Sequence, residues 1–300
     1  MKSIRVMGCL VNGIAIFLCF GVCGCTKSSR VIPVKVFGNE VLIGPRDISI
    51  SDAESCVYVI DGRNRVLKFS DDGKYIGEWN GDRKTGKLRS PSSVCVSPKG
   101  VLITDTFNSR IIQLDYKLNR SRIFIGTDAK DDKLKFPQGI RFDAERRLLV
   151  CDLGNNRIRR YGADGKMIDD VDNINQIGLV SRVAVGPQNT MLLLSGANCK
   201  VQKYDSSGTL VFTMGRCGAK ESEFNNPLGL DVDERGYAYV SDAGNDRIIV
   251  IDPSGRAIES IGSKGDKMGE FNDPCGIAIF KDKIFVADYG NNRIQILRIK

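Results

Sequence analysis

The sequence contains no histidine among its 300 residues. Without an imidazole it cannot carry a Ser-His-Asp or Cys-His catalytic relay, a histidine-ligated zinc site or a histidine general base near neutral pH. Tryptophan is limited to one residue, but eight tyrosines, thirteen phenylalanines and an apolar content of 42% are enough for a large core. The composition therefore indicates a globular protein and excludes many classes of enzyme.

A strong excess of one charge sign is also missing. The chain has 44 lysines and arginines against 36 aspartates and glutamates, a formal net charge of +8. This modest surplus could favour an anionic surface, but evenly mixed charge usually forms a solvated exterior.

The first residues resemble an export signal. Lys2 and Arg5 precede an apolar run from Val6 to Gly24, which predicts a secretory signal peptide over residues 1–24. The run ends in Val-Cys-Gly-Cys, which resembles the bacterial lipoprotein signal box. The resemblance implies a lipid on Cys25, a short tether over 25–30 and a protein attached to the outer membrane or cell surface of the bacterial envelope. An uncleaved membrane anchor is the alternative, because the run could just span a bilayer core of about 30 Å.

Ten cysteines are present, and four of them lie in this first segment. The other six are scattered without any CxxC spacing, which argues against a metal knuckle or a thioredoxin-type motif. They are Cys56, Cys95, Cys151, Cys199, Cys217 and Cys275. Buried free thiols are the default expectation, while an exported chain could pair Cys199 with Cys217.

One segment recurs six times at intervals of 43 to 47 residues. Each copy starts with an acid, or a serine in the fourth copy, and has an asparagine three residues later and a basic residue close behind. The copies begin at Asp61, Asp105, Asp152, Ser195, Asp242 and Asp288. A residue set that occurs in every copy is expected to build the repeat, not to catalyse a reaction, because a catalytic site needs only one copy.

Each repeat contains four short apolar stretches separated by turn residues such as Asp72-Gly73 and Ser254-Gly255. Four antiparallel strands that recur about every 40–50 residues are typical of a β-propeller. The sequence predicts an all-β, six-bladed β-propeller over residues 31–300. The sixth repeat reaches Lys300 without an outer strand, so Val31 to Phe37 is expected to supply that strand and close the ring like Velcro.

The repeats resemble the NHL repeat family. Phe224 to Gly229 and Phe271 to Gly276 follow its F-x-x-P-x-G opening, and the Asp-x-x-Asn-x-Arg core follows in the third, fifth and sixth repeats. The fourth repeat is the weakest, with Val180 in place of the proline and Ser195 in place of the aspartate. The resemblance implies a six-bladed propeller. Its members include sensor domains of bacterial receptor kinases, RNA- and protein-binding domains of animal ubiquitin ligases, and a few lyases.

Residues that differ between the blades are the candidates for binding. In propellers, the loops that lead into each first strand share one face with the turns between second and third strands. The candidates on this face are Arg46, Arg63, Phe107, Gln138, Arg182 and Tyr289. Its arginines suit an anionic group and its aromatic residues suit stacking, although ordinary exposed loop residues are an equally simple interpretation.

Two charged residues occupy equivalent positions of the first strands. Arg141 belongs to the third blade and Asp231 to the fifth, and first strands crowd the propeller axis. We expect them to form a structural ion pair across the channel in preference to a ligand site.

No catalytic residue, metal site or cofactor is predicted. The expected function is that of an exported, monomeric propeller that binds a protein, peptide or glycan without chemistry. The first alternative is a metal-dependent enzyme with a channel site, like six-bladed lactonases or lyases. The second is an RNA-binding propeller, suggested by the basic segment from Arg83 to Arg89 and opposed by the predicted export.

Overall fold

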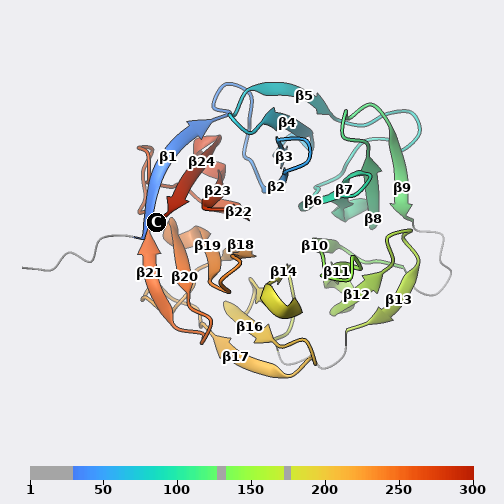
Figure 1. Ribbon diagram of the computed structural model, residues 1–300. Helices are drawn as coiled ribbons and strands as arrows, with labels where there is room; N and C mark the ends of the chain where they lie inside the picture. Colours follow the sequence, from blue (N-terminus) through green and yellow to red (C-terminus); the bar gives the residue numbers. More distant parts are fainter. Residues whose placement is uncertain (1–29, 127–132, 172–176) are drawn as a thin grey trace, which may run out of the picture.

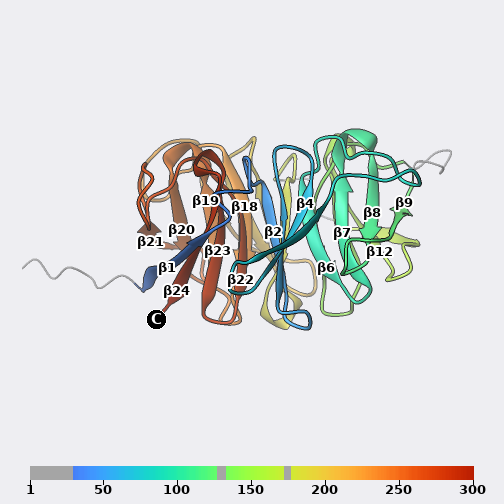
Figure 2. The same cartoon turned by 90° about the horizontal axis from the view of Figure 1, so that it is seen from above.

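The computed structural model describes residues 30–126, 133–171 and 177–300. In these ranges, six four-stranded antiparallel sheets stand around a common axis (Figure 1). Seen from the side, their strands run between two faces of a short cylinder (Figure 2). The predicted six-bladed, all-β propeller is therefore confirmed. The predicted signal peptide and Cys25 lie outside the described residues.

The first three blades follow the chain in order, from the axis outwards. Blade 1 consists of β2 (Asp47–Ser51), β3 (Cys56–Ile60), β4 (Val66–Ser70) and β5 (Tyr75–Trp79). Blade 2 consists of β6 (Ser93–Ser97), β7 (Gly100–Asp105), β8 (Arg110–Leu114) and β9 (Ser121–Ile125). Blade 3 consists of β10 (Pro137–Phe142), β11 (Leu148–Asp152), β12 (Arg157–Tyr161) and β13 (Met167–Asp170).

The remaining blades repeat this order, except for the outer strand of the last. Blade 4 consists of β14 (Arg182–Val185), β15 (Met191–Ser195), β16 (Lys200–Tyr204) and β17 (Leu210–Met214). Blade 5 consists of β18 (Pro227–Val232), β19 (Ala238–Asp242), β20 (Arg247–Ile251) and β21 (Ala257–Ile261). Blade 6 consists of β22 (Pro274–Phe280), β23 (Lys283–Asp288), β24 (Arg293–Ile299) and β1 (Val31–Phe37).

Strand β1 closes the ring. It pairs antiparallel with β24, from Val31 opposite Ile299 to Phe37 opposite Ile294. The outer strand of blade 6 therefore comes from the other end of the described chain, as the sequence predicted. This pairing covers an edge of β24 that would otherwise expose unpaired backbone groups.

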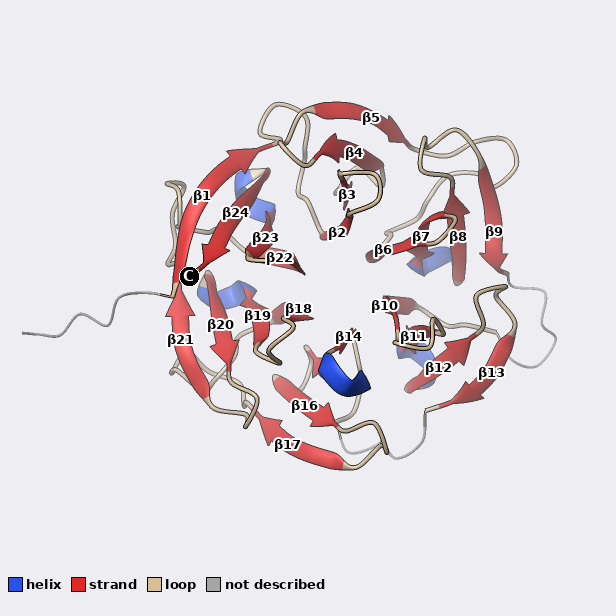
Figure 3. Cartoon of the chain, in the orientation of Figure 1, coloured by secondary structure: helices blue, strands red, loops and turns tan. Residues whose placement is uncertain are grey.

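Short 3₁₀ helices mark the two faces of the ring. Four of them follow a second strand: η1 (Thr106–Asn108), η2 (Leu153–Asn155), η4 (Ala243–Asn245) and η5 (Tyr289–Asn291). The fifth, η3 (Pro187–Asn189), follows the first strand of blade 4 and so lies at the opposite end of its hairpin (Figure 3). The face with the loops that lead into the first strands and the turns after the second strands is called here the leading face.

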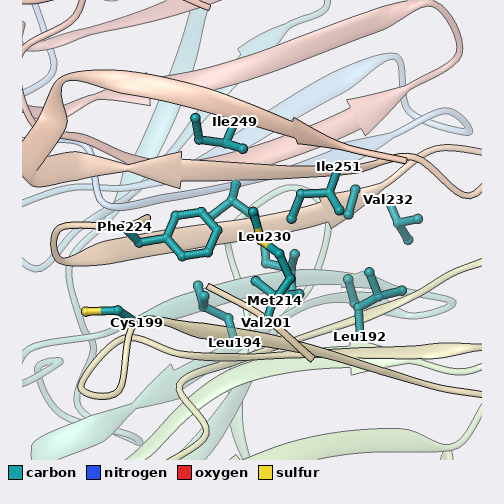
Figure 4. Packing of buried hydrophobic residues seen from close by; sticks show 13 residues of the cluster. Leu192, Leu194, Cys199, Val201, Met214, Phe224, Leu230, Val232, Ile249 and Ile251 are labelled. Carbon is teal, nitrogen blue, oxygen red and sulfur yellow. The ribbon is translucent and has the colours of Figure 1, made fainter. Parts of the chain in front are cut away.

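The hydrophobic core is divided among the contacts between blades. Six clusters of buried residues occur in the described chain, and each joins two neighbouring blades, so that every interface of the ring has one. Figure 4 shows the cluster between blades 4 and 5, in which Leu194 and Met214 face Leu230 and Ile249. Each blade is thus stabilised by its neighbours, as expected of a repeat protein.

The cysteines follow the default expectation in four cases of six. Cys56, Cys95, Cys151 and Cys275 are buried free thiols. Cys199 and Cys217 instead form a disulfide, so free thiols were the wrong expectation for this pair. The turn after β15 and the segment after β17 bring the two side chains together, which the spacing in the sequence did not determine.

None of the helices in the described ranges has the length and apolar character needed to cross a membrane.

Candidate functional site

The recurring aspartate of each repeat lies in a dense hydrogen-bond network. In blade 5, Asp242 is fully buried, and its Oδ1 accepts a hydrogen bond from the Asn225 backbone at 2.6 Å. Its Oδ2 accepts bonds from Asn245 Nδ2 and Arg247 Nε, both at 2.8 Å. Arg247 also donates to the Lys220 carbonyl at 2.7 Å. The carboxylate therefore fastens the turn after β19 to the connection between blades.

Three other blades repeat this arrangement closely. Asp105, Asp152 and Asp288 each bind the asparagine and the arginine of their own repeat through Oδ2. Each also accepts a backbone N–H from the loop that leads into its blade. Because these carboxylates are saturated with intramolecular partners, the geometry supports the interpretation that the recurring residues build the blades.

A cavity of about 400 Å³ opens on the leading face, around the beginnings of the first strands. All six blades contribute a residue from the start of, or just before, their first strand: Arg46, Ser92, Gln138, Arg182, Leu228 and Cys275. Its other lining residues are Pro91, Asn226, Asp273 and Tyr289. This cavity is called here the axial pocket.

Four of the six binding candidates line the axial pocket: Arg46, Gln138, Arg182 and Tyr289. Arg63 is exposed but does not line it. Phe107 is also outside the lining; its side chain is 57% exposed and contacts the Phe136 ring edge-on, with ring centroids 5.9 Å apart. The structure thus brings together the candidates from the loops before the first strands and leaves out two candidates from the turns after the second strands.

Six lining residues were not among the binding candidates proposed from the sequence: Pro91, Ser92, Asn226, Leu228, Asp273 and Cys275. Asn226 and Asp273 stand directly before the proline of the F-x-x-P-x-G opening. Pro91 is the corresponding proline of blade 2. Both residues before proline have positive φ, +51° in each case. The signal that would have found Asn226 and Asp273 is the variable residue before this repeated proline.

Close contact between neighbouring blades positions the pocket residues. The Gly276 N–H donates to the Arg46 carbonyl at 2.9 Å, and the Gly139 N–H donates to the Ser181 carbonyl at 3.0 Å. A Cβ on Gly276 would lie 2.5 Å from the Asp47 Cα atom. The last glycine of the opening motif therefore lets the adjacent loop approach, and this fixes the backbone of Arg46 and of the residue before Arg182.

The two arginines of the pocket have few partners. Arg46 Nη1 donates to Ser90 Oγ at 3.3 Å. Arg182 donates to the Ser92 and Ser181 carbonyls at 3.1 and 3.3 Å, and its buried Nε has no hydrogen-bond partner among the described residues. Neither arginine forms a salt bridge with a described carboxylate. They differ in this from Arg110, Arg157, Arg247 and Arg293 of the repeats, each of which is paired with an aspartate.

Two buried titratable groups belong to the same region: Cys275 lines the pocket, and Asp47 follows the lining residue Arg46 in the sequence. Burial raises the pKa of the Asp47 carboxyl, while the Arg182 guanidinium acts in the opposite direction; Asp47 Oδ2 accepts the Val94 N–H at 2.9 Å. Burial also raises the pKa of the Cys275 thiol to about 12. A thiol with this pKa stays protonated near neutral pH and is a poor nucleophile.

Arg141 and Asp231 join the first strands of blades 3 and 5, β10 and β18. Arg141 Nη2 lies 2.7 Å from Asp231 Oδ1, and Asp231 Oδ2 accepts the Ile279 N–H at 2.8 Å. The Asp231 charge raises the pKa of Arg141. Since both carboxylate oxygens have partners, this pair joins blades 3, 5 and 6, which is the geometry of a structural ion pair.

Within residues 30–126, 133–171 and 177–300, no group of three or more His, Cys, Asp or Glu side chains is arranged to hold a metal ion.

Comparison with known sequences gives one family match. The NHL repeat matches residues 271–297, which cover the end of the connection into blade 6 and most of that blade. A comparison with curated proteins finds no match.

Several solved structures share the fold. The catalytically inactive histidine-to-alanine variant of virginiamycin B lyase from Staphylococcus aureus, solved with quinupristin, superposes with a TM-score of 0.59 and 18% identity over 86% of this chain and 95% of its own. An auxiliary nutrient binding protein from Bacteroides thetaiotaomicron superposes with a TM-score of 0.66 and 14% identity, over 85% of this chain and 69% of its own. A putative gluconolactonase superposes with a TM-score of 0.65 and 12% identity, over 86% of this chain and 89% of its own. These identities show a shared fold alone.

Proposed function

We propose that this NHL-repeat β-propeller is a non-catalytic binding module that receives its ligand or partner in the axial pocket. The observation that carries the proposal is the contrast between two sets of polar residues. The recurring aspartates of blades 2, 3, 5 and 6 are saturated with intramolecular hydrogen bonds, whereas the pocket arginines, which have no counterpart in the other blades, keep unused Nη donors. The pocket arginines are therefore available to a ligand.

A lyase or lactonase activity is the second candidate, because enzymes of both kinds share the fold. The lyase of known structure is named as inactive when one histidine is replaced by alanine, and this chain has no histidine. The thiol that lines the pocket has a raised pKa and is not poised as a nucleophile. Another protein with the same fold is named as a nutrient binding protein, which supports a binding function. Binding is therefore the better supported function.

The proposal includes export and attachment to the bacterial envelope through a lipid on Cys25. The Cys199–Cys217 disulfide supports export, because disulfides persist mainly in oxidising compartments outside the cytosol. Metabolic labelling with an alkyne fatty acid is expected to mark the native protein and not a Cys25→Ser variant. Equal labelling of both would contradict lipidation at this residue.

The binding function can be tested by photo-crosslinking in native envelopes. A benzophenone amino acid at position 289 places the probe at the axial pocket, and the same amino acid at position 75 is the matched control. Both positions hold a tyrosine of similar exposure, 37% for Tyr289 and 40% for Tyr75, but Tyr75 lies on the outer strand β5.

We expect a defined adduct from position 289 that is absent from position 75. The adduct should disappear when Arg182 is replaced by methionine in the same protein. An adduct that forms equally from both positions, or none from position 289, would contradict the proposed use of this face.

A further inference from the structure

We infer that the axial pocket binds a small solute with a single carboxylate, which the Arg46 and Arg182 guanidinium groups receive. This inference rests on the proposed binding function and names the chemical class of its ligand. It follows from the hydrogen-bond state of the two arginines, the charge balance of the pocket and its size.

The donors of both arginines are underused. Arg46 makes one side-chain hydrogen bond, at 3.3 Å, and Arg182 makes two, at 3.1 and 3.3 Å, all to neutral oxygens. The Nε of Arg182 is buried out of reach of a ligand, so the Nη groups of the two arginines are the donors that a ligand can meet. A guanidinium offers a planar set of N–H donors that matches the two oxygens of a carboxylate. A bound carboxylate would therefore engage Nη donors that the protein itself leaves free.

The charge of the lining favours a monoanion. Asp273 also lines the pocket, so the two positive charges are offset by one negative charge at the wall. Asp47, next to Arg46 in the sequence, does not line the pocket; it interacts electrostatically with Arg182, but its burial raises its pKa and favours its uncharged form. The charges of these lining residues sum to +1, so a carboxylate brings the lining to zero, whereas a doubly charged group such as phosphate would leave it negative.

Asp273 also indicates what else the ligand carries. No described residue donates a hydrogen bond or an ion pair to its side-chain carboxylate, and the residue is exposed. A carboxylate in this state is an acceptor for a ligand hydroxyl or ammonium group. The ligand we infer therefore has an acid at one end and a hydrogen-bond donor at another.

The remaining wall limits the size and shape of the ligand. The cavity of about 400 Å³ is at the small end of ligand pockets, which hold about 300–1,000 Å³. Leu228 and the Tyr289 ring form apolar surfaces, while Gln138 and Asn226 add amide groups. A monomeric acidic sugar and the carboxyl end of a short peptide both fit this description and share the same carboxylate.

Titration calorimetry with two matched pairs of probes tests the inference and separates these sources. The first pair is galacturonate and its neutral relative galactose, and the second is alanyl-alanine and its C-terminal amide. We expect the acid of one pair to bind, with its neutral partner weaker by about tenfold or more, because hydrogen bonds to a charged group contribute at least this much. The pair that shows the difference identifies the source of the carboxylate.

Substitutions assign the effect to the two arginines. Arg182→Met and Arg46→Met should each weaken binding of the acid by about tenfold or more and leave the weak binding of the neutral partner unchanged. Arg83→Met is the control, since Arg83 is exposed and lies outside the pocket lining. Melting temperatures of all variants verify the fold.

Three results would overturn the inference: no binding of either acid at millimolar concentrations, equal binding of acid and neutral partner, or undiminished binding by both arginine variants. If the crosslink from position 289 still forms in these cases, the binding function stands and only its carboxylate chemistry is wrong. If the crosslink is also absent, both proposals fail.

Discussion

Blades 4 and 5 place different chemistry on the same backbone. In blade 5, Asp246 Oδ2 lies 3.7 Å from Lys264 Nζ, and at the equivalent positions of blade 4 Cys199 and Cys217 form a disulfide. The backbone matches closely, with φ of +53° at Asp246 and +51° at Cys199. The segments that hold Cys217 and Lys264 each make an isolated bridge, to Phe224 and Phe271.

The two blades also differ in the residue that anchors the repeat. Asp242 of blade 5 accepts three hydrogen bonds, whereas the buried Oγ of Ser195 in blade 4 has no partner among the described residues. The disulfide is therefore found in the blade that lacks the carboxylate network. The carboxylate fixes the turn after β19 to the connection that enters blade 5, whereas the disulfide fixes the turn after β15 to the connection that leaves blade 4. The comparison teaches that the turn after a second strand can be fixed to either neighbouring connection, by whichever bond the sequence provides.

The largest effect is expected from removing the anchor of blade 5. Asp242→Ala leaves Arg247 and buried N–H groups without their acceptor, and should lower the free energy of unfolding by about 3 kcal/mol. Ser195→Ala removes an unpaired hydroxyl and should change the free energy of unfolding by less than about 0.5 kcal/mol. Urea unfolding of both variants provides the measurement. Equal losses would show that the network does not distinguish the blades.

The next effect is the loss of the disulfide. Replacing Cys199 and Cys217 together by alanine opens a crosslink across 18 residues and should reduce the stability by about 3 kcal/mol at most. The matched change in blade 5, Lys264→Ala, should alter it by less than about 1 kcal/mol, because Lys264 is 78% exposed and exposed ion pairs contribute little. Urea unfolding of the native protein and of the two variants, with and without a reductant, checks both predicted losses. A reductant effect on the double alanine variant would contradict the assignment.

A transfer of the disulfide sharpens the comparison. Asp246→Cys with Lys264→Cys should form a crosslink in blade 5 under oxidising conditions, seen as a loss of free thiols and faster migration in a non-reducing gel. The gain in stability should be about 1–2 kcal/mol, since engineered disulfides deliver less than native ones and the Asp273 N–H loses its acceptor. Thiols that stay free would show that the two sites are not equivalent.

The smallest effect is expected on the stability of the protein at acidic pH. Asp205 and Asp252 occupy equivalent turns before the outer strands of blades 4 and 5. The Ser207 hydroxyl lowers the pKa of Asp205; burial alone would raise the pKa of Asp252, but bonds from Ser254 and Arg256 lower it. A carboxyl whose pKa is lower in the folded than in the unfolded state stabilises the protein at a pH above its unfolded pKa of about 3.9. This stabilisation is lost as the pH falls through the folded-state pKa. Asp252→Asn and Asp205→Asn should each flatten the melting temperature between pH 4 and pH 2. An unchanged pH profile would contradict these contributions.

The fold could be predicted from the sequence because repetition averages out local ambiguity. One stretch such as Tyr237 to Ser241 is an uncertain strand, but six copies at a regular spacing predict a blade. The closing strand followed from the missing outer strand of the sixth repeat. The Cys199–Cys217 bond could not be derived, because it depends on the path of the segment after β17 and not on the 18-residue separation.

The axial pocket was predicted in part, for a reason visible in the arrangement of the strands. The first strands are nearest the axis, and the turns after the second strands lie farther out (Figure 1). Arg63 and Phe107 belong to such turns and do not line the pocket. Tyr289 does line it, and its ring lies over Gly44, where an added Cβ would be 2.7 Å from the ring. Sequence position gives the face of a residue but not its distance from the axis.

The central claim is that recurring residues build the ring and the pocket arginines serve a ligand. Urea unfolding of Arg182→Met tests it most directly, with Asp242→Ala as the reference. If Arg182 is kept for binding, its removal eliminates a buried unpaired Nε, and the free energy of unfolding should stay within about 0.5 kcal/mol of the native value or rise. A loss as large as that of Asp242→Ala would mean that Arg182 is part of the scaffold and would contradict the account.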